Sequence, residues 1–245
     1  MSRELEHLLT GFEAFRIEHF EIEPARMREL AESGQRPKVL VVACSDSRTD
    51  PAILTRARPG DLFIVRNVAA LVPAYLAGDT AKGTSSAIEF GVRGLEVEDI
   101  VVLGHAQCGG IGLLAEGGSG APGRFEFVGD WVERAAAARD AVERSAVEGP
   151  AKARALELAT VATSLGHLLT FPWVRERVQA GRLALHGWYF DLQAGRLLVF
   201  DPARQEFVVG DGRSHPLVGP GVNPPDLARV VASTPDAAGS SAPER

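Results

Sequence analysis

The sequence predicts an α/β fold with a mainly parallel central sheet, helices flanking that sheet, and a helical arm at the N-terminus. Three short, uninterrupted apolar runs, at 39–43, 62–65 and 100–103, are typical of strands buried on both faces. Segments with helical spacing precede and separate these runs. Such alternation indicates parallel strands that are joined by crossover connections.

The remaining elements follow from the spacing of apolar residues and from capping signals. We expect helices at 3–21, 24–33, 80–94, 125–147 and 150–170. Thr80 or Thr84 would serve as N-cap of the third helix. A β-hairpin of residues 183–192 and 197–200, which turns at Ala194 and Gly195, would extend the sheet.

The chain is expected to form one large domain with two appendages. Its 245 residues, of which 45% are hydrophobic, suffice for one substantial core. We therefore expect an N-terminal helical arm at 1–34, a catalytic α/β domain at 35–212 and a flexible C-terminal tail at 213–245. The tail is expected because its later part is rich in Pro, Ala, Ser and Gly and poor in apolar residues.

Charge and hydropathy exclude several classes of protein. The net charge of −6 leaves no basic surface of the kind that a phosphate backbone requires, so we expect no nucleic-acid partner. No apolar run approaches the roughly 20 residues of a membrane span, and the first fifteen residues are too charged for a secretory signal. We therefore expect a soluble, cytoplasmic protein in which both cysteines are reduced.

The two cysteines of the chain occur in a pattern that indicates a catalytic zinc site. Cys44 ends the first apolar run and opens CSDSR, whereas His105 and Cys108 follow the third run in HAQC. Ligands bind beyond the carboxyl ends of strands in open α/β sheets. Two thiolates and one imidazole suit Zn²⁺ and leave the fourth tetrahedral position open. A cysteine at the end of a buried strand is usually a core residue, so the combination of the three residues carries the prediction.

Asp46 and Arg48 are the candidate catalytic residues beside this metal. On most surfaces such a pair would be an ordinary ion pair that contributes ~0–1 kcal/mol. Next to a metal ligand, Asp46 can block the fourth position, or Arg48 can hold it aside to orient a bound water. The remaining histidines are expected to be structural, at His167 and His186, or solvated, at 7, 19 and 215.

Two other classes of open Cys₂His zinc enzyme are tested by their motifs. An alcohol dehydrogenase requires a strand followed by a G-x-G-x-x-G turn, and the loop at 117–123 has neither. A nucleobase deaminase requires His-x-Glu and Pro-Cys-x-x-Cys, which the sequence lacks. Neither hydride transfer nor deamination is expected.

These residues resemble the β-class carbonic anhydrases. The resemblance rests on CSDSR, RNVA and GHAQCGG, and it extends through PGDLFIVRN, IEFGV, LEVEDIVVLGH and HGWYFDLQAG, roughly from Gln35 to Asp201. It implies the predicted fold, zinc on the three ligands, and reversible hydration of carbon dioxide to bicarbonate and a proton by attack of a zinc-bound hydroxide. It also implies a homodimer or a higher homo-oligomer.

Within that family, the sequence is similar to the plant-like subclass. The other subclass has a tryptophan three residues before the first ligand, where this chain has Val41; the plant-like subclass has a glutamine nine residues before it, where this chain has Gln35. This resemblance implies an open metal position, with Gln35 donating to substrate across a dimer interface. It also assigns an apolar wall to Phe63 and Val68 and substrate positioning to the Gly109 amide. The pocket tyrosine of the subclass is replaced by Phe90, which removes one pocket hydrogen bond.

Two alternative functions stay open at this point. One is an enzyme of the same fold that hydrolyses carbon disulfide or carbonyl sulfide, which only an assay would separate. The other is a non-catalytic zinc-thiolate module, structural or redox-responsive, against which the intact Asp46 and Arg48 argue.

Overall fold

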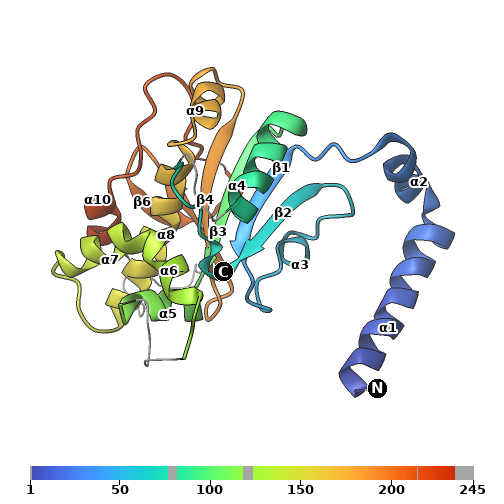
Figure 1. Ribbon diagram of the computed structural model, residues 1–245, viewed down its shortest axis with the longest axis horizontal. Helices are drawn as coiled ribbons and strands as arrows, with labels where there is room; N and C mark the ends of the chain where they lie inside the picture. The colour runs from blue at the N-terminus through green and yellow to red at the C-terminus, as the bar shows by residue number, and fades with distance from the viewer. Residues whose placement is uncertain (1, 77–81, 118–123, 214, 235–245) are drawn as a thin grey trace, which may run out of the picture.

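The central element of the computed structural model is a six-stranded mixed sheet (Figure 1). The structure describes residues 2–76, 82–117, 124–213 and 215–234. The strands are β1 (Val39–Cys44), β2 (Leu62–Asn67), β3 (Asp99–His105), β4 (Ala184–Asp191), β5 (Arg196–Asp201) and β6 (Glu206–Val209), in the order β2-β1-β3-β4-β5-β6. The first four of that order are parallel, and β5 and β6 are antiparallel to their neighbours. The predicted fold class is confirmed.

The register brings the carboxyl ends of the inner strands to one edge of the sheet. Cys44 pairs with Asn67 of β2, and Ala43 pairs with Leu103 of β3. His105, the last residue of β3, lies at the same edge. Hydrogen bonding between parallel strands therefore places the two cysteine-bearing segments side by side.

The described residues also form α-helices. They are α1 (Arg3–Arg16), α2 (Pro24–Ser33), α3 (Pro51–Thr55), α4 (Lys82–Glu89), α5 (Gly109–Ala115), α6 (Val128–Val132), α7 (Ala136–Glu143), α8 (Pro150–Leu168), α9 (Pro172–Gln179) and α10 (Leu227–Ala232). Short 3-10 or π segments extend several of them: η1 (Ile17–Ile22), η2 (Val68–Ala70), η3 (Phe90–Gly94) and η4 (Glu133–Ala135). No helix in the described part of the chain is long and apolar enough to cross a membrane.

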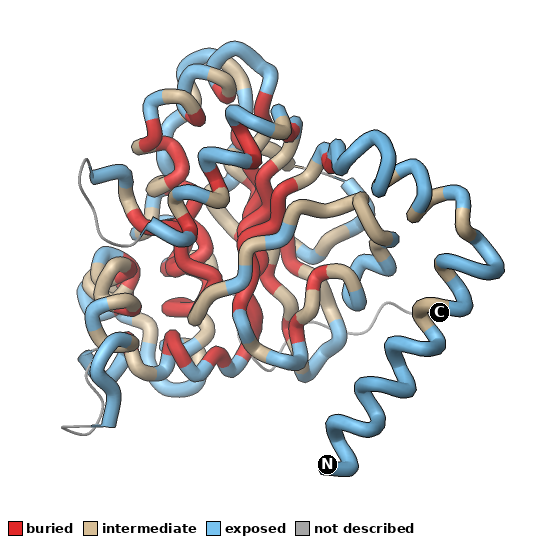
Figure 2. The backbone as a smooth tube through the Cα atoms, turned by 45° about the vertical axis from the view of Figure 1, so that its right-hand side comes forward, coloured by how far each residue is buried: buried red, intermediate tan, exposed pale blue. Residues whose placement is uncertain are grey.

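The main core lies between the sheet and α8. Alternate residues of β1 and β3 point into it, and α8 contributes Val161 and Leu165. Glycine permits the close approach of this helix: a Cβ on Gly104 would lie 2.4 Å from Val161 Cγ2, and one on Gly187 would lie 2.9 Å from Leu165 Cδ1. Figure 2 shows the buried residues concentrated in these strands and the helices that cover them.

The N-terminal arm extends away from the rest of the chain (Figures 1 and 2). None of the residues of α1 is buried, and its apolar side chains, such as Leu8 and Phe12, are exposed. The contact with the body lies at α2, where Arg26 donates to the Pro59 carbonyl at 2.9 Å and pairs with Asp61. The apolar side of α1 is therefore not covered by any other element among the described residues.

Several local predictions differ from the structure. The helix expected at 125–147 is divided into α6, η4 and α7, because Ala135 leaves helical geometry at ψ 19°. The segment 213–245, expected to be a flexible tail, contains α10, whose Val230 and Val231 are fully buried against the body. Through these residues the short helix packs on α7 and α8. The proposed N-cap Thr80 lies outside the described residues, and Thr84 lies within α4 rather than before it.

Candidate metal centre

Three potential metal ligands meet at the carboxyl edge of the sheet. Cys44 is the last residue of β1, His105 is the last of β3, and Cys108 is the N-cap of α5. All three are buried, and their ligand atoms lie within 4.8 Å of one another. The structure thus brings together the three ligands predicted from the sequence, from two strands and one helix start.

The orientation of His105 suits a metal ligand. Its Nδ1 lies 2.8 Å from the Ala106 carbonyl oxygen, which accepts a hydrogen bond from the Nδ1–H tautomer. That tautomer leaves the lone pair on Nε2, which is buried and has no hydrogen-bond partner among the described residues. A buried unpaired nitrogen is costly, and coordination of a cation would satisfy it.

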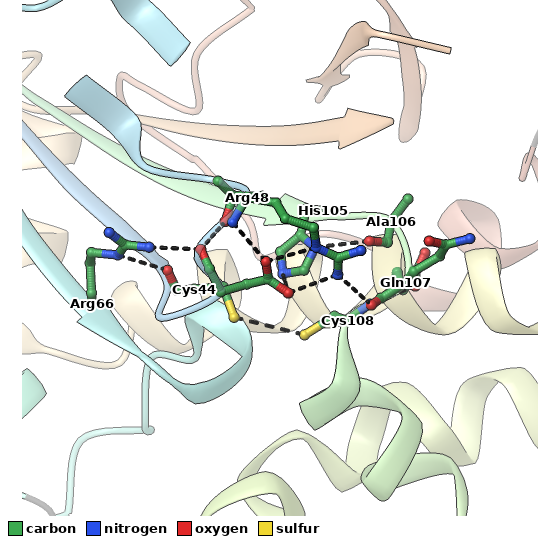
Figure 3. Close-up of polar contacts among 10 residues, drawn as sticks. Cys44, Arg48, Arg66, His105, Ala106, Gln107 and Cys108 are labelled. Carbon is green, nitrogen blue, oxygen red and sulfur yellow. Dashed lines mark hydrogen bonds and ion pairs between the residues drawn. The ribbon is translucent and has the colours of Figure 1, made fainter. Parts of the chain in front are cut away.

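The sulfur spacing also fits zinc. The two sulfur atoms lie 3.9 Å apart (Figure 3). Two thiolates on a tetrahedral zinc, each about 2.3 Å from the metal, would lie about 3.8 Å apart. The donor set and the sulfur spacing therefore agree with two thiolate ligands on one zinc ion.

The ionisation of the two thiols is linked. The pKa of Cys44 is lowered to about 4 because Cys108 donates a hydrogen bond to it. The same contact, together with burial, raises the pKa of Cys108. Two adjacent thiolates repel each other, so the bare protein favours one thiolate and one thiol. A divalent cation would supply the positive charge that both thiolates need.

Asp46 and Arg48 form a closely matched pair above the ligands. Arg48 Nε lies 2.9 Å from Asp46 Oδ1, and Nη2 lies 2.8 Å from Oδ2. The hydrogen bonds from Arg48 hold the pKa of Asp46 well below its usual range, despite the opposing effect of burial. Asp46 Oδ2 lies 4.0 Å from His105 Nε2. An ionised carboxylate therefore stands next to the expected metal position, held by the guanidinium.

Arg66 fixes the backbone that carries this pair. From the end of β2, its Nε donates to the Cys44 carbonyl at 2.9 Å and its Nη2 donates to the Asp46 carbonyl at 2.7 Å (Figure 3). Nη1 is paired with Asp50, which caps α3. The RNVA motif beginning at Arg66 was visible in the sequence, but its role depends on the pairing of β1 with β2.

The predicted substrate residues occupy two different places. Val68 and Gly109 lie at the carboxyl edge of the sheet, beside the potential metal ligands. Val68 packs in the apolar cluster that contains both cysteines, and the backbone amide of Gly109 lies in the first turn of α5. Phe63 and Gln35 lie toward the opposite edge of the sheet, where β1 and β2 begin. Phe63 pairs with Leu40 of β1 and contacts Phe90 at 5.9 Å between ring centroids.

Gln35 cannot reach the cysteines of its own chain. It precedes β1 and is exposed, whereas Cys44 ends that strand. The six residues of β1 rise by roughly 3.3 Å each, which separates the strand ends by roughly 17 Å. The structure thus does not bring Gln35 or Phe63 to the metal site of the same chain.

Sequence reasoning missed a buried carboxylate behind Cys108. Glu157 of α8 accepts a hydrogen bond from the Cys108 amide at 3.3 Å, and Tyr189 of β4 donates to its other oxygen at 2.6 Å. Burial raises the pKa of Glu157. A Glu inside an alanine-rich helix gives no local signal, and only the packing of α8 on the sheet shows its role.

The comparisons with known proteins agree with this geometry. The model of the family described as "Carbonic anhydrase" matches residues 39–197. A carbonic anhydrase of Pseudomonas aeruginosa is 37% identical over 203 residues, which cover 82% of this chain and 90% of the relative. "Beta carbonic anhydrase 3" of Arabidopsis thaliana is 37% identical over 196 residues, which cover 78% of this chain and 74% of the relative. The chain belongs to the β-class carbonic anhydrase family. That family consists of lyases, the carbonate dehydratases.

Solved structures of β-carbonic anhydrases share the fold. The β-carbonic anhydrase CcaA superposes with a TM-score of 0.80 at 30% identity, over 87% of this chain and 95% of that one. A tetrameric β-carbonic anhydrase of Sordaria macrospora gives a TM-score of 0.68 at 26% identity, over 81% and 97%. The match spans nearly the whole of each of these structures.

Proposed function

We propose that this chain catalyses the reversible hydration of carbon dioxide to bicarbonate and a proton with zinc held by Cys44, His105 and Cys108. The observation that carries the proposal is the unpaired, buried Nε2 of His105 facing two sulfurs at zinc spacing, with an arginine-held carboxylate 4.0 Å away. When bound, zinc would lower the pKa of a coordinated water to about 7 and so provide the nucleophile.

Asp46 would orient that nucleophile and receive its hydrogen bond. Its carboxylate is ionised at neutral pH and acts as an acceptor, and the hydrogen bond from Arg48 lowers its pKa further. Arg48 holds both oxygens and keeps the carboxylate from swinging onto the metal. Val41 stands where the regulated subclass has tryptophan, which supports an open fourth position and the plant-like assignment.

The substrate would lie between an apolar wall and hydrogen-bond donors. Val68 borders the cysteines on the apolar side, which suits a nonpolar substrate, and the Gly109 amide supplies a donor for the developing carboxylate. Gln35 and Phe63 would reach the site of a second copy, because neither reaches its own. A homo-oligomer, at least a dimer, follows from this proposal, and the exposed apolar residues of α1 support it.

Domain limits and location complete the proposal. We propose residues 35–212 as the catalytic domain, with the helical arm before it and with α10, from the segment that follows, packed against it. Two buried cysteines without a disulfide between them suit a reducing compartment such as the cytoplasm.

Two measurements test the proposal together: zinc content, and carbon dioxide hydration by stopped flow. One zinc per chain with rapid hydration supports the proposal, and one zinc per chain without hydration contradicts it. In the latter case, turnover of carbon disulfide or carbonyl sulfide would favour the related hydrolase. Inactivity toward all three substrates would favour the zinc-thiolate module.

A further inference from the structure

We propose that Glu157 is a positioning residue that acts through the peptide group between Gln107 and Cys108. It would hold the Cys108 ligand and, through the same peptide, the Arg48 guanidinium that restrains Asp46. This inference rests on the proposed zinc site, and it assigns a function to a buried carboxylate that does not touch the substrate position.

The peptide group between Gln107 and Cys108 is bound on both sides. Its carbonyl oxygen accepts a hydrogen bond from Arg48 Nη2 at 3.2 Å (Figure 3), and its N–H donates to Glu157 Oε1 at 3.3 Å. A peptide group is planar, so its C=O and N–H rotate together. The side chain that holds the N–H therefore also directs the carbonyl toward Arg48.

Glu157 is itself held firmly. It is 9% exposed, and its second oxygen accepts a hydrogen bond from Tyr189 Oη at 2.6 Å. Tyr189 itself is 1% exposed. The ring of Tyr189 lies under the Arg154 guanidinium, which is paired with Asp191 at 2.6 Å. A continuous chain of polar contacts thus runs from β4 through α8 to the aspartate beside the metal position.

The backbone at Gln107 explains why such support is required. Its φ is +57°, in the left-handed region that residues with a side chain rarely occupy. Strained backbone persists where surrounding contacts determine it. With the acceptor at Glu157 removed, the peptide can rotate away, which would displace the Cys108 sulfur and remove the carbonyl partner of Arg48.

Two substitutions separate the hydrogen bond from the charge. Glu157→Gln keeps an oxygen in reach of the Cys108 amide but removes the charge. Glu157→Asp keeps the charge but withdraws the oxygens by one methylene. Thr163→Ala is the matched control, since Thr163 is also buried on α8 but its hydroxyl donates to its own helix, at the Ala159 carbonyl.

The test measures the zinc dissociation constant by chelator competition and the sulfur-to-cobalt charge-transfer spectrum of the Co²⁺ form. We expect Glu157→Asp to weaken zinc binding about 10–100-fold and to shift the cobalt spectrum. Glu157→Gln should stay within about threefold of wild type, as should Thr163→Ala. The proposal would be overturned if Glu157→Asp and Thr163→Ala lost equal zinc affinity. It would also be overturned if Glu157→Gln lost more zinc affinity than Glu157→Asp.

Neither readout depends on carbon dioxide turnover. A wild-type protein that binds zinc tightly but hydrates no carbon dioxide would refute the proposed function. The ranking of the Asp and Gln variants in metal affinity would still decide whether Glu157 positions the ligand.

Discussion

The Arg48 guanidinium donates to both carboxylate oxygens of Asp46, from Nε to Oδ1 at 2.9 Å and from Nη2 to Oδ2 at 2.8 Å. The backbone amide of Arg48 donates to Oδ1 as well, at 2.9 Å. Three hydrogen bonds from one residue thus fix a carboxylate that stands 4.0 Å from the expected metal-binding nitrogen of His105. In the proposed mechanism, this pair would decide whether the aspartate orients a ligand on the metal or becomes a ligand itself.

Removal of the guanidinium should release the aspartate. In Arg48→Ala we expect zinc to remain bound while hydration at pH 7.5 falls about 10–100-fold, because Asp46 is free to turn onto the metal. Arg93→Ala serves as the control, because Arg93 pairs with Glu89 on the surface, where 61% of the Arg93 side chain is exposed. Unchanged turnover in Arg48→Ala would contradict the restraining role.

Loss of a thiolate should remove the metal. Cys108→Ser replaces a soft thiolate with a hydroxyl that zinc binds poorly. We expect less than about one tenth of the wild-type zinc content after dialysis against a chelator. A fully loaded variant would refute the ligand assignment, and circular dichroism would show whether the fold is intact.

Substitution of two glycines of α5, one packed and one open, tests how closely this helix packs at the site. A Cβ on Gly110 would lie 2.7 Å from Val68 Cγ1 and 3.0 Å from Ala69 Cβ, whereas one on Gly112 would have no atom within 4 Å. Gly110→Ala should destabilise the fold by about 1–3 kcal/mol through overpacking. Gly112→Ala should be neutral or stabilising by up to about 1 kcal/mol. Urea unfolding compares the two, and equal effects would contradict this contact.

The buried pair between Arg154 and Asp191 should make stability depend on pH. Burial tends to raise the pKa of Asp191, but Arg154 and the amides of Ala194 and Gln193 outweigh it, so the pKa is lowered. A lowered folded-state pKa stabilises the protein above the unfolded value of about 3.9, and this contribution is lost as pH falls below it.

Asp191→Asn should therefore be less stable than wild type by about 1–3 kcal/mol at pH 7, and the two should converge as pH falls through the lowered folded-state pKa of Asp191. Urea unfolding at several pH values checks this. Glu98→Gln is the surface control, since Glu98 pairs with Lys38 while 60% of its side chain is exposed. A constant difference between Asp191→Asn and wild type at all pH values would contradict the linkage.

The sequence predicted that Cys44 and His105 lie close together, because the signals for this arrangement are local. Apolar runs marked the strands, and Cys44 and His105 came at the ends of those runs, so parallel pairing alone brings them together. The hairpin of β4 and β5 was equally visible, with its turn at Gly195.

Other features depend on contacts between distant parts of the chain. The role of Glu157 arises from the way α8 crosses β3 and β4, and the role of Arg66 arises from its reach across two strand ends. The exposure of the apolar residues of α1 is of the same kind, because spacing within a helix does not show which surface its apolar side contacts.

The most direct test of the central proposal is stopped-flow hydration of carbon dioxide by zinc-loaded protein from pH 6.5 to 9 under reducing conditions. An open metal site with Asp46 held by Arg48 predicts activity near neutrality that rises smoothly with the ionisation of the bound water. Activity absent below about pH 8 that appears steeply above it would show that Asp46 caps the metal, and would contradict the open site proposed here.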